Sequence, residues 1–152
     1  MIAAAIDTNI LVYAAQHDGD RAKHDAATTL LRSLSLAQRA MLPLQALSEF
    51  YAVAARKTGI SPEDIAAFMR VLAEMFPVRE AVLADVLEAA RIHQAHGVPF
   101  WDGMLWSVAR RNGARYVLSE DFQDGRELEG VRFVNPFMPG NAALLSQIAA
   151  RA

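Results

Sequence analysis

The sequence predicts a single α/β domain, a three-layer α/β/α sandwich around a central, mostly parallel sheet. Short apolar segments alternate along the chain with longer segments of helical periodicity, as expected when parallel strands are joined by helices. The length of 152 residues suits one domain, and 53% hydrophobic with 21% charged residues is typical of a folded protein with a substantial core. We find no internal repeat or linker that would divide the chain.

Five apolar segments predict the strands of the sheet. Each is short and bounded by polar or turn-forming residues, which is typical of a buried parallel strand. The third contains Pro77, and because proline cannot donate a ladder hydrogen bond, we expect this strand near an edge of the sheet. The predicted strands cover residues 2–6, 40–42, 76–78, 116–118 and 131–134.

Start and stop signals define the helices between these strands. The segment Ser61–Asp64 combines a capping residue, a first-turn proline and first-turn acids, which together start a helix. The pair Asn112-Gly113 is a typical helix stop. Thr8 or Asn9 could cap the first helix, and Asp20 the second. The predicted helices cover residues 8–16, 20–34, 43–57, 81–96 and 99–112, with another that starts at 61.

Composition excludes several classes of protein. A net charge of -2 argues against a broadly basic nucleic-acid binder, and the absence of cysteine excludes disulfides, thiolate catalysis and thiolate metal sites. No apolar segment approaches the roughly 20 residues of a membrane span, and the N-terminus lacks the charged region of a signal peptide. We therefore expect a cytoplasmic protein with no membrane association.

Four carboxylates are placed where such a sheet binds its ligands. Asp7 and Asp121 each follow an apolar strand, and ligands of parallel sheets collect at the carboxyl ends of the strands. Glu49 lies inside a helix beside small or apolar residues at three- and four-residue spacing, so its face should approach the sheet. Asp102 lies in the first turn of its helix, in line with apolar residues, and should point toward the core.

Convergence of these acids would be costly without a cation. Two unit charges about 4 Å apart repel by about 4 kcal/mol at an effective dielectric constant near 20. A set of ligands made only of oxygen atoms favours Mg²⁺ or Mn²⁺ over zinc. The sequence therefore predicts a divalent-metal site, and the chemistry expected of it is metal-assisted hydrolysis of a phosphodiester.

Each of these residues also has an ordinary structural interpretation. Asp7 could simply cap a helix, and Asp121 could form a turn. Glu120 and Asp124 compete with Asp121 for any role in the site. Glu49 could be a solvated helical residue, since charged side chains are rarely buried.

The sequence also predicts where the two tryptophans lie and which cations contact the substrate. Trp101 and Trp106 are expected in the core because large aromatic side chains usually pack there. The alternative for Trp101 is the rim of the cleft, where its ring would stack on a base. The candidates for contacts with substrate phosphates are Arg21, Lys23, Arg56 and Arg126.

Five segments in a fixed order carry a resemblance to a known family. They are Ile6–Tyr13, Ser48–Phe50, Pro99–Asp102, Val117–Gly125 and Asn135–Phe137. The ordered set resembles PIN-domain ribonucleases and, within them, the VapC-like toxins of bacterial toxin–antitoxin modules. We therefore expect residues 1–137 to form a PIN-like nuclease domain and residues 138–152 a C-terminal helical tail, packed on the same domain or at an interface.

The resemblance implies a sheet in the order 3-2-1-4-5 and an endoribonuclease that depends on Mg²⁺ or Mn²⁺. It also implies RNA as the substrate, a cognate antitoxin as the partner, and a homodimer. Asn9 and Ser119 would hold carboxylates or metal-bound water in place, and Asp124 would contribute from further out. The family's catalytic and metal-binding acids carry over onto Asp7, Glu49, Asp102 and Asp121.

Two rival functions and one departure from the family pattern remain open at this point. A PIN-fold module could bind RNA or a protein without cutting, although acids at all four positions argue against it. A phosphatase on a similar sheet would want a second aspartate at position 9, where this chain has Asn9. Gly103 stands where the family commonly has alanine, and we expect it to loosen the first turn of its helix.

Overall fold

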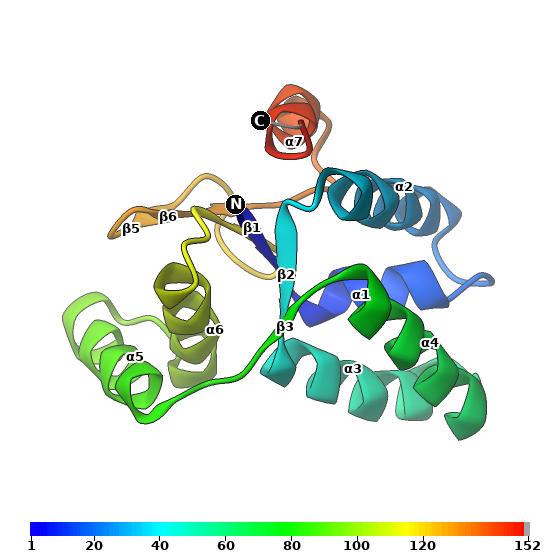
Figure 1. The fold of residues 1–152 in the computed structure, drawn as a ribbon, viewed down its shortest axis with the longest axis horizontal. Coiled ribbons are helices and arrows are strands. Elements are labelled where there is room, and N and C mark those ends of the chain that lie inside the picture. The colour runs from blue at the N-terminus through cyan, green and yellow to red at the C-terminus, as the bar shows by residue number, and fades with distance from the viewer. Residues whose placement is uncertain (151–152) are drawn as a thin grey trace.

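Six strands form one sheet in the computed structural model, which describes residues 1–150 (Figure 1). Their order is β3-β2-β1-β4-β6-β5, and every neighbouring pair is parallel except β5 with β6. The strands are β1 (Ala4–Ile6), β2 (Ala40–Pro43), β3 (Val78–Arg79), β4 (Tyr116–Leu118), β5 (Glu127–Leu128) and β6 (Val131–Val134). The predicted order of the five parallel strands is confirmed, and β3 lies at the predicted edge.

The antiparallel strand β5 was not predicted from the sequence. It pairs with β6 through a tight turn at Glu129 and Gly130, whose φ angles are 46° and 86°. Positive φ at both central residues is the signature of the hairpin turn that matches the twist of the flanking strands, and glycine adopts it without strain. The pair Glu129-Gly130 was therefore the signal in the sequence that could have predicted this hairpin.

Seven α-helices and one short 3-10 helix surround the sheet within residues 1–150. On one face, α1 to α4 and α7 contribute to one apolar core, and on the other face α5 and α6 build a second (Figure 1). The elements are α1 (Thr8–Ala15), α2 (Arg21–Ala37), α3 (Leu44–Lys57), α4 (Pro62–Met75), α5 (Leu83–His96), α6 (Phe100–Arg111), η1 (Pro139–Asn141) and α7 (Ala142–Ile148). The predicted three-layer α/β/α sandwich is confirmed.

Successive apolar residues of a strand face opposite sides of the sheet and so contribute to the two cores in turn. In β1, Ala4 and Ile6 face the core under α1 to α4, whereas Ala5 faces the core under α5 and α6. All three residues of β1 are fully buried, which is why this central strand has no polar position. The first polar side chain after β1 is that of Asp7, at the edge of the sheet.

The C-terminal tail packs on its own domain within the described residues. Ile148 is only 2% exposed and belongs to the core beneath α1 to α4, and its carbonyl oxygen accepts a hydrogen bond from Arg39 Nε at 3.3 Å. The last two residues of the predicted tail, 151 and 152, lie outside the described residues. No helix within residues 1–150 is long and apolar enough to cross a membrane.

Gly103 serves the contact between α5 and α6. A Cβ atom at this position would lie 3.2 Å from Ala89 Cα and 3.3 Å from the Ala89 carbonyl oxygen. These are backbone atoms of α5 and cannot rotate away as a flexible side chain could. Gly103 therefore allows the two helices to approach closely, a role in packing that the sequence did not predict.

We expect Gly103→Val to lower the free energy of unfolding by about 1–3 kcal/mol, the usual cost of overpacking a tight contact. The matched control is Gly140→Val, because a Cβ atom there would meet no atom within 4 Å. Urea unfolding of both variants is the measurement. Equal midpoints for Gly103→Val and the wild type would contradict the packing role.

Candidate functional site

A cleft of about 360 Å³ opens where β1 and β4 end. It contains all four of the carboxylates that the sequence singles out, drawn from α1, α3, α6 and the segment after β4. The residues that line it are Asp7, Thr8, Asn9, Val12, Tyr13, Gln45, Glu49, Val53, Lys57, Trp101, Asp102, Leu105, Glu120 and Asp121. Tertiary structure thus brings together acids that are up to 114 residues apart in the chain.

Asp7 is the most buried of the four acids, with 9% of its surface exposed. Its carboxylate caps α1 by accepting a hydrogen bond from Thr8 N at 2.7 Å, and it also accepts one from Ser119 Oγ at 2.7 Å. Asp7, rather than Thr8 or Asn9, is therefore the N-cap. Burial raises the pKa of Asp7 to about 6, because these hydrogen bonds offset only part of the desolvation and the charges of Asp121 and Glu49 add to it.

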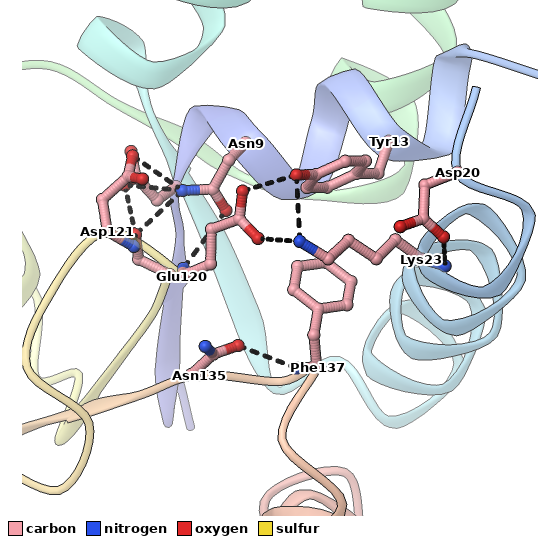
Figure 2. A network of polar contacts seen from close by, with 10 residues as sticks. Asn9, Tyr13, Asp20, Lys23, Glu120, Asp121, Asn135 and Phe137 are labelled. Atoms are coloured by element: carbon pink, nitrogen blue, oxygen red, sulfur yellow. Dashed lines mark hydrogen bonds and ion pairs between the residues drawn. The ribbon is translucent and has the colours of Figure 1, made fainter.

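Asn9 and Ser119 join Asp7 to Asp121, and Figure 2 shows Asn9 beside Asp121. Asn9 Nδ2 lies 3.0 Å from Ser119 Oγ, 3.1 Å from Asp121 Oδ2 and 3.5 Å from Asp7 Oδ2. Ser119 is 1% exposed, and its hydroxyl also accepts a hydrogen bond from Asp121 N at 3.1 Å. The Asn9 amide and the Ser119 hydroxyl thus hold the carboxylates of Asp7 and Asp121 at the carboxyl ends of β1 and β4.

Glu49 and Asp102 face the same cleft under different constraints. Glu49 accepts hydrogen bonds from Thr8 Oγ1 at 3.2 Å and from Gln45 Nε2 at 3.1 Å. The carboxylate of Asp102 forms no hydrogen bond or ion pair with any residue in the range 1–150. Burial, followed by the charges of Asp121 and Glu49, raises the pKa of Asp102. A half-buried carboxylate that repels its neighbours needs a cation more than any other group in the cleft.

Glu120 and Asp124, which compete with Asp121 in the sequence, have other partners. Glu120 accepts hydrogen bonds from Lys23 Nζ at 2.7 Å and from the Tyr13 hydroxyl at 2.6 Å (Figure 2). Asp124 is absent from the cleft lining and accepts hydrogen bonds from Asn135 N and Asn141 Nδ2 instead. Of these three acids, Asp121 is therefore the one that lines the cleft and is not paired with a cation; its carboxylate is held by Asn9.

The cluster around Lys23 also ties the C-terminal segment to the site. Lys23 Nζ lies 4.9 Å from the centre of the Tyr13 ring and 5.5 Å from the centre of the Phe137 ring. The rings of Tyr13 and Phe137 meet edge to face at 5.1 Å. Because Glu120 and these rings hold its ammonium group, Lys23 is a structural cation at the edge of the cleft (Figure 2).

The family model of the PIN domain matches residues 4–123 of this chain. The chain belongs to the PIN domain family. The match contains all four cleft carboxylates together with Asn9 and Ser119, and it ends before the segment that carries Phe137 and α7. No curated protein matches the sequence.

Solved structures share the fold of this PIN domain at low sequence identity. VapC20 of Mycobacterium tuberculosis, described as a toxin that cleaves the sarcin–ricin loop, is 18% identical with a TM-score of 0.62, and the match covers 76% of this chain and 87% of that one. A toxin–antitoxin complex from Klebsiella pneumoniae is 18% identical with a TM-score of 0.61, covering 88% and 98%. DNA-bound VapBC from Salmonella typhimurium is 17% identical with a TM-score of 0.63, covering 88% and 97%.

The oxygen-bearing side chains in the cleft of this PIN domain are of the kind that bind a hard divalent cation. Every carboxylate, amide and hydroxyl at the site offers oxygen, and the raised pKa values of Asp7 and Asp102 report mutual repulsion as well as burial. Within residues 1–150, however, no three histidine or acidic side chains are already grouped as a coordination shell. The PIN-domain cleft thus has the right ligands in an open arrangement.

The exposure of Trp101 and the identity of the cation that lines the PIN-domain cleft differ from the prediction. Trp106 is fully buried as expected, but Trp101 is 63% exposed and lines the cleft, so its core assignment is wrong and the alternative at the rim is correct. The four cations that the sequence suggested for phosphate contacts do not line the cleft, whereas Lys57 does; those four are Arg21, Lys23, Arg56 and Arg126. Lys57 lies two helical turns beyond Glu49, so the four-residue spacing was the signal that could have found it.

The raised pKa of Asp7 makes a pH-dependent prediction for Asp7→Asn. Folding raises the pKa from 3.8 to about 6, so the wild type loses stability as pH rises from about 4 to about 6, and the asparagine variant does not. We expect the difference in unfolding free energy to move in favour of the variant over this window, by about 3 kcal/mol at most. Urea unfolding of metal-free protein at pH 4.5 and pH 7.5 measures it.

Asp85→Asn is the control, because folding shifts the pKa of Asp85 in the opposite direction from that of Asp7. Asp85 is 1% exposed, and although burial pushes its pKa upward, hydrogen bonds from Arg111, Val82 N and Ser107 outweigh burial and lower the pKa. The stability that this carboxylate contributes is complete above about pH 4 and is lost only below it, so the disadvantage of the variant should stay nearly constant between pH 4.5 and pH 7.5. A pH-independent difference for Asp7→Asn would contradict the raised pKa.

Proposed function

We propose that this PIN domain is a divalent-metal-dependent endoribonuclease that hydrolyses RNA phosphodiester bonds. The observation that carries the proposal is the convergence of Asp7, Glu49, Asp102 and Asp121 on one cleft, where Asp102 has no partner within residues 1–150. A fold that keeps such a charge unpaired and half-buried gains from a cation bound beside it. Mg²⁺ or Mn²⁺ is the cation proposed for this set of oxygen ligands.

The proposed roles of the residues follow from their contacts. The four carboxylates would hold the metal, which when bound lowers the pKa of an attacking water and offsets negative charge at the phosphate. Asn9 and Ser119 keep Asp7 and Asp121 in position through the hydrogen bonds described above. Thr8 and Gln45 restrain Glu49 in the same way.

The proposed cellular role is that of the toxin in a toxin–antitoxin pair, acting in the cytoplasm. Support comes from the similar folds of a VapC toxin and of two toxin–antitoxin assemblies, together with membership of the PIN family. A cognate antitoxin would then block the cleft, and a cation from the antitoxin could pair with the unpartnered carboxylate. A homodimer is proposed as the assembly of the toxin.

We expect Asp7→Asn and Asp102→Asn each to reduce single-turnover RNA cleavage by orders of magnitude. A neutral amide oxygen is a poor substitute for a carboxylate ligand of Mg²⁺ or Mn²⁺. Asp18→Asn, at an exposed position outside the cleft, is the matched control and should cleave like the wild type. Cleavage retained in both cleft variants would contradict the proposal.

Thermal unfolding of the same proteins gives a second measure of metal binding. Millimolar Mn²⁺ should raise the melting temperature of the wild type by mass action, and should raise that of the two cleft variants less. A metal-induced stabilisation without cleavage would favour the non-catalytic PIN-fold module. An unchanged melting temperature in the wild type would count against the metal site itself.

The toxin proposal makes a separate prediction in cells. Induced expression of the wild-type chain should arrest bacterial growth, whereas expression of Asp102→Asn should not, because only the former would hydrolyse RNA. Co-expression of a small protein encoded beside the gene should restore growth and should co-purify with the chain. Normal growth with well-expressed, cleavage-competent protein would separate the nuclease activity from the toxin role.

A further inference from the structure

One face of α3 runs along the whole cleft. Gln45, Glu49, Val53 and Lys57 follow one another at four-residue intervals, and all four line the cleft. With a rise of 1.5 Å per residue, Gln45 and Lys57 are separated by about 18 Å along the helix axis. The cleft is therefore longer than a metal site requires, and Glu49 lies nearer to its Gln45 end.

The far end of the cleft carries a cation with no protein partner. The chain contains only two lysines, Lys23 and Lys57, and the first is neutralised by Glu120. The ammonium group of Lys57 forms no hydrogen bond or ion pair with any other residue of the described chain. Its neighbour Arg56 shares the last turn of α3, where the helix dipole favours cations, but it does not line the cleft. Lys57 lies in the same last turn and gains the same stabilisation, but unlike Arg56 it also lines the cleft.

The near end carries an exposed aromatic ring. Trp101 is 63% exposed, although Trp106 on the same helix is fully buried. Gln45 Nε2 donates a hydrogen bond to the Trp101 carbonyl oxygen at 3.2 Å, and the Phe100 ring meets the indole edge to face at 5.4 Å. The indole thus stands beside the unpartnered Asp102, on a backbone that is anchored to α3.

We propose that the cleft is a groove for one RNA strand, with a base stacked on Trp101 at one end and a backbone phosphate bound by Lys57 at the other. An exposed indole can stack only on a base that is free of a duplex, and stacking tolerates any sequence. An unpaired ammonium suits a phosphate, whereas the acids between the two ends repel one. This inference rests on the proposed ribonuclease function and assigns two positioning residues to the same site.

Intrinsic fluorescence tests the aromatic end, because Trp101 is exposed and Trp106 provides a buried internal reference. In EDTA at low salt, an unstructured single-stranded RNA should quench the wild-type emission, and a fully paired blunt-ended duplex should not. Because Trp101→Leu removes the reporting indole, its affinity is measured by anisotropy of labelled RNA, and it should bind about tenfold more weakly, the usual loss for one stacked base. Trp101→Tyr should keep most of the affinity, which excludes a folding defect as the cause.

The salt dependence of binding tests the cationic end. Lys57→Gln should reduce the slope of log affinity against log salt concentration by about 0.7, the value for one phosphate contact on a single strand. Arg56→Gln, one residue away and outside the cleft, should keep the wild-type slope. An unchanged slope in Lys57→Gln would overturn this half of the proposal, and a wild-type affinity for single-stranded RNA in Trp101→Leu would overturn the other.

Addition of Mn²⁺ to the same mixtures separates this inference from the proposed function. Binding with the predicted quenching and slope, but without cleavage, would refute the nuclease and retain the two contacts. Cleavage that depends on Asp7 but not on Trp101 or Lys57, in either affinity or KM, would do the reverse. Quenching by a peptide but not by RNA would assign the groove to a protein segment and overturn the inference.

Discussion

The parallel pairing of β1 with β4 is the constraint on which the site depends. Ile6 pairs with Leu118, so the next residues, Asp7 and Ser119, leave the sheet side by side. The hydrogen bond from Ser119 Oγ to Asp7 Oδ2 then closes at 2.7 Å between residues 112 positions apart. Because both side chains are buried, a slip of register would leave a buried carboxylate without its donor, and the sheet and the site therefore support each other.

The ion pairs within the protein decide which acids are left without a cation and can bind a metal. Lys23 neutralises Glu120 at the edge of the cleft, and Arg111 neutralises Asp85 far from it. No cation of the described chain pairs with the four cleft carboxylates, and burial, followed by the charges of Asp121 and Glu49, raises the pKa of Asp102. The protein folds with this charge uncompensated, so the energetic cost is tolerated within the fold and would be relieved by a bound cation.

Local signals predicted the parallel strands and most helix boundaries because apolar runs and capping residues act over a few positions. The antiparallel strand β5 was missed because it has only two residues and depends on its turn. The place of Trp101 was misjudged, and the packing role of Gly103 was not foreseen, because each depends on the residues that lie opposite in the folded chain. Exposure of the indole and the approach of Ala89 are properties of the packing of α6 against α3 and α5.

The sequence by itself determined the α/β class, the order of the elements and the identity of the acids at the carboxyl ends of the strands, since periodicity and strand ends are local. Only the tertiary structure decided which acids share a cleft. Asp121 bonds to Asn9, Glu120 to Lys23 and Asp124 to Asn141, although the three acids lie within five residues of one another. Partners from distant segments make this choice, because hydrogen bonds and ion pairs form through space, and the chain reveals those neighbours only when it is folded.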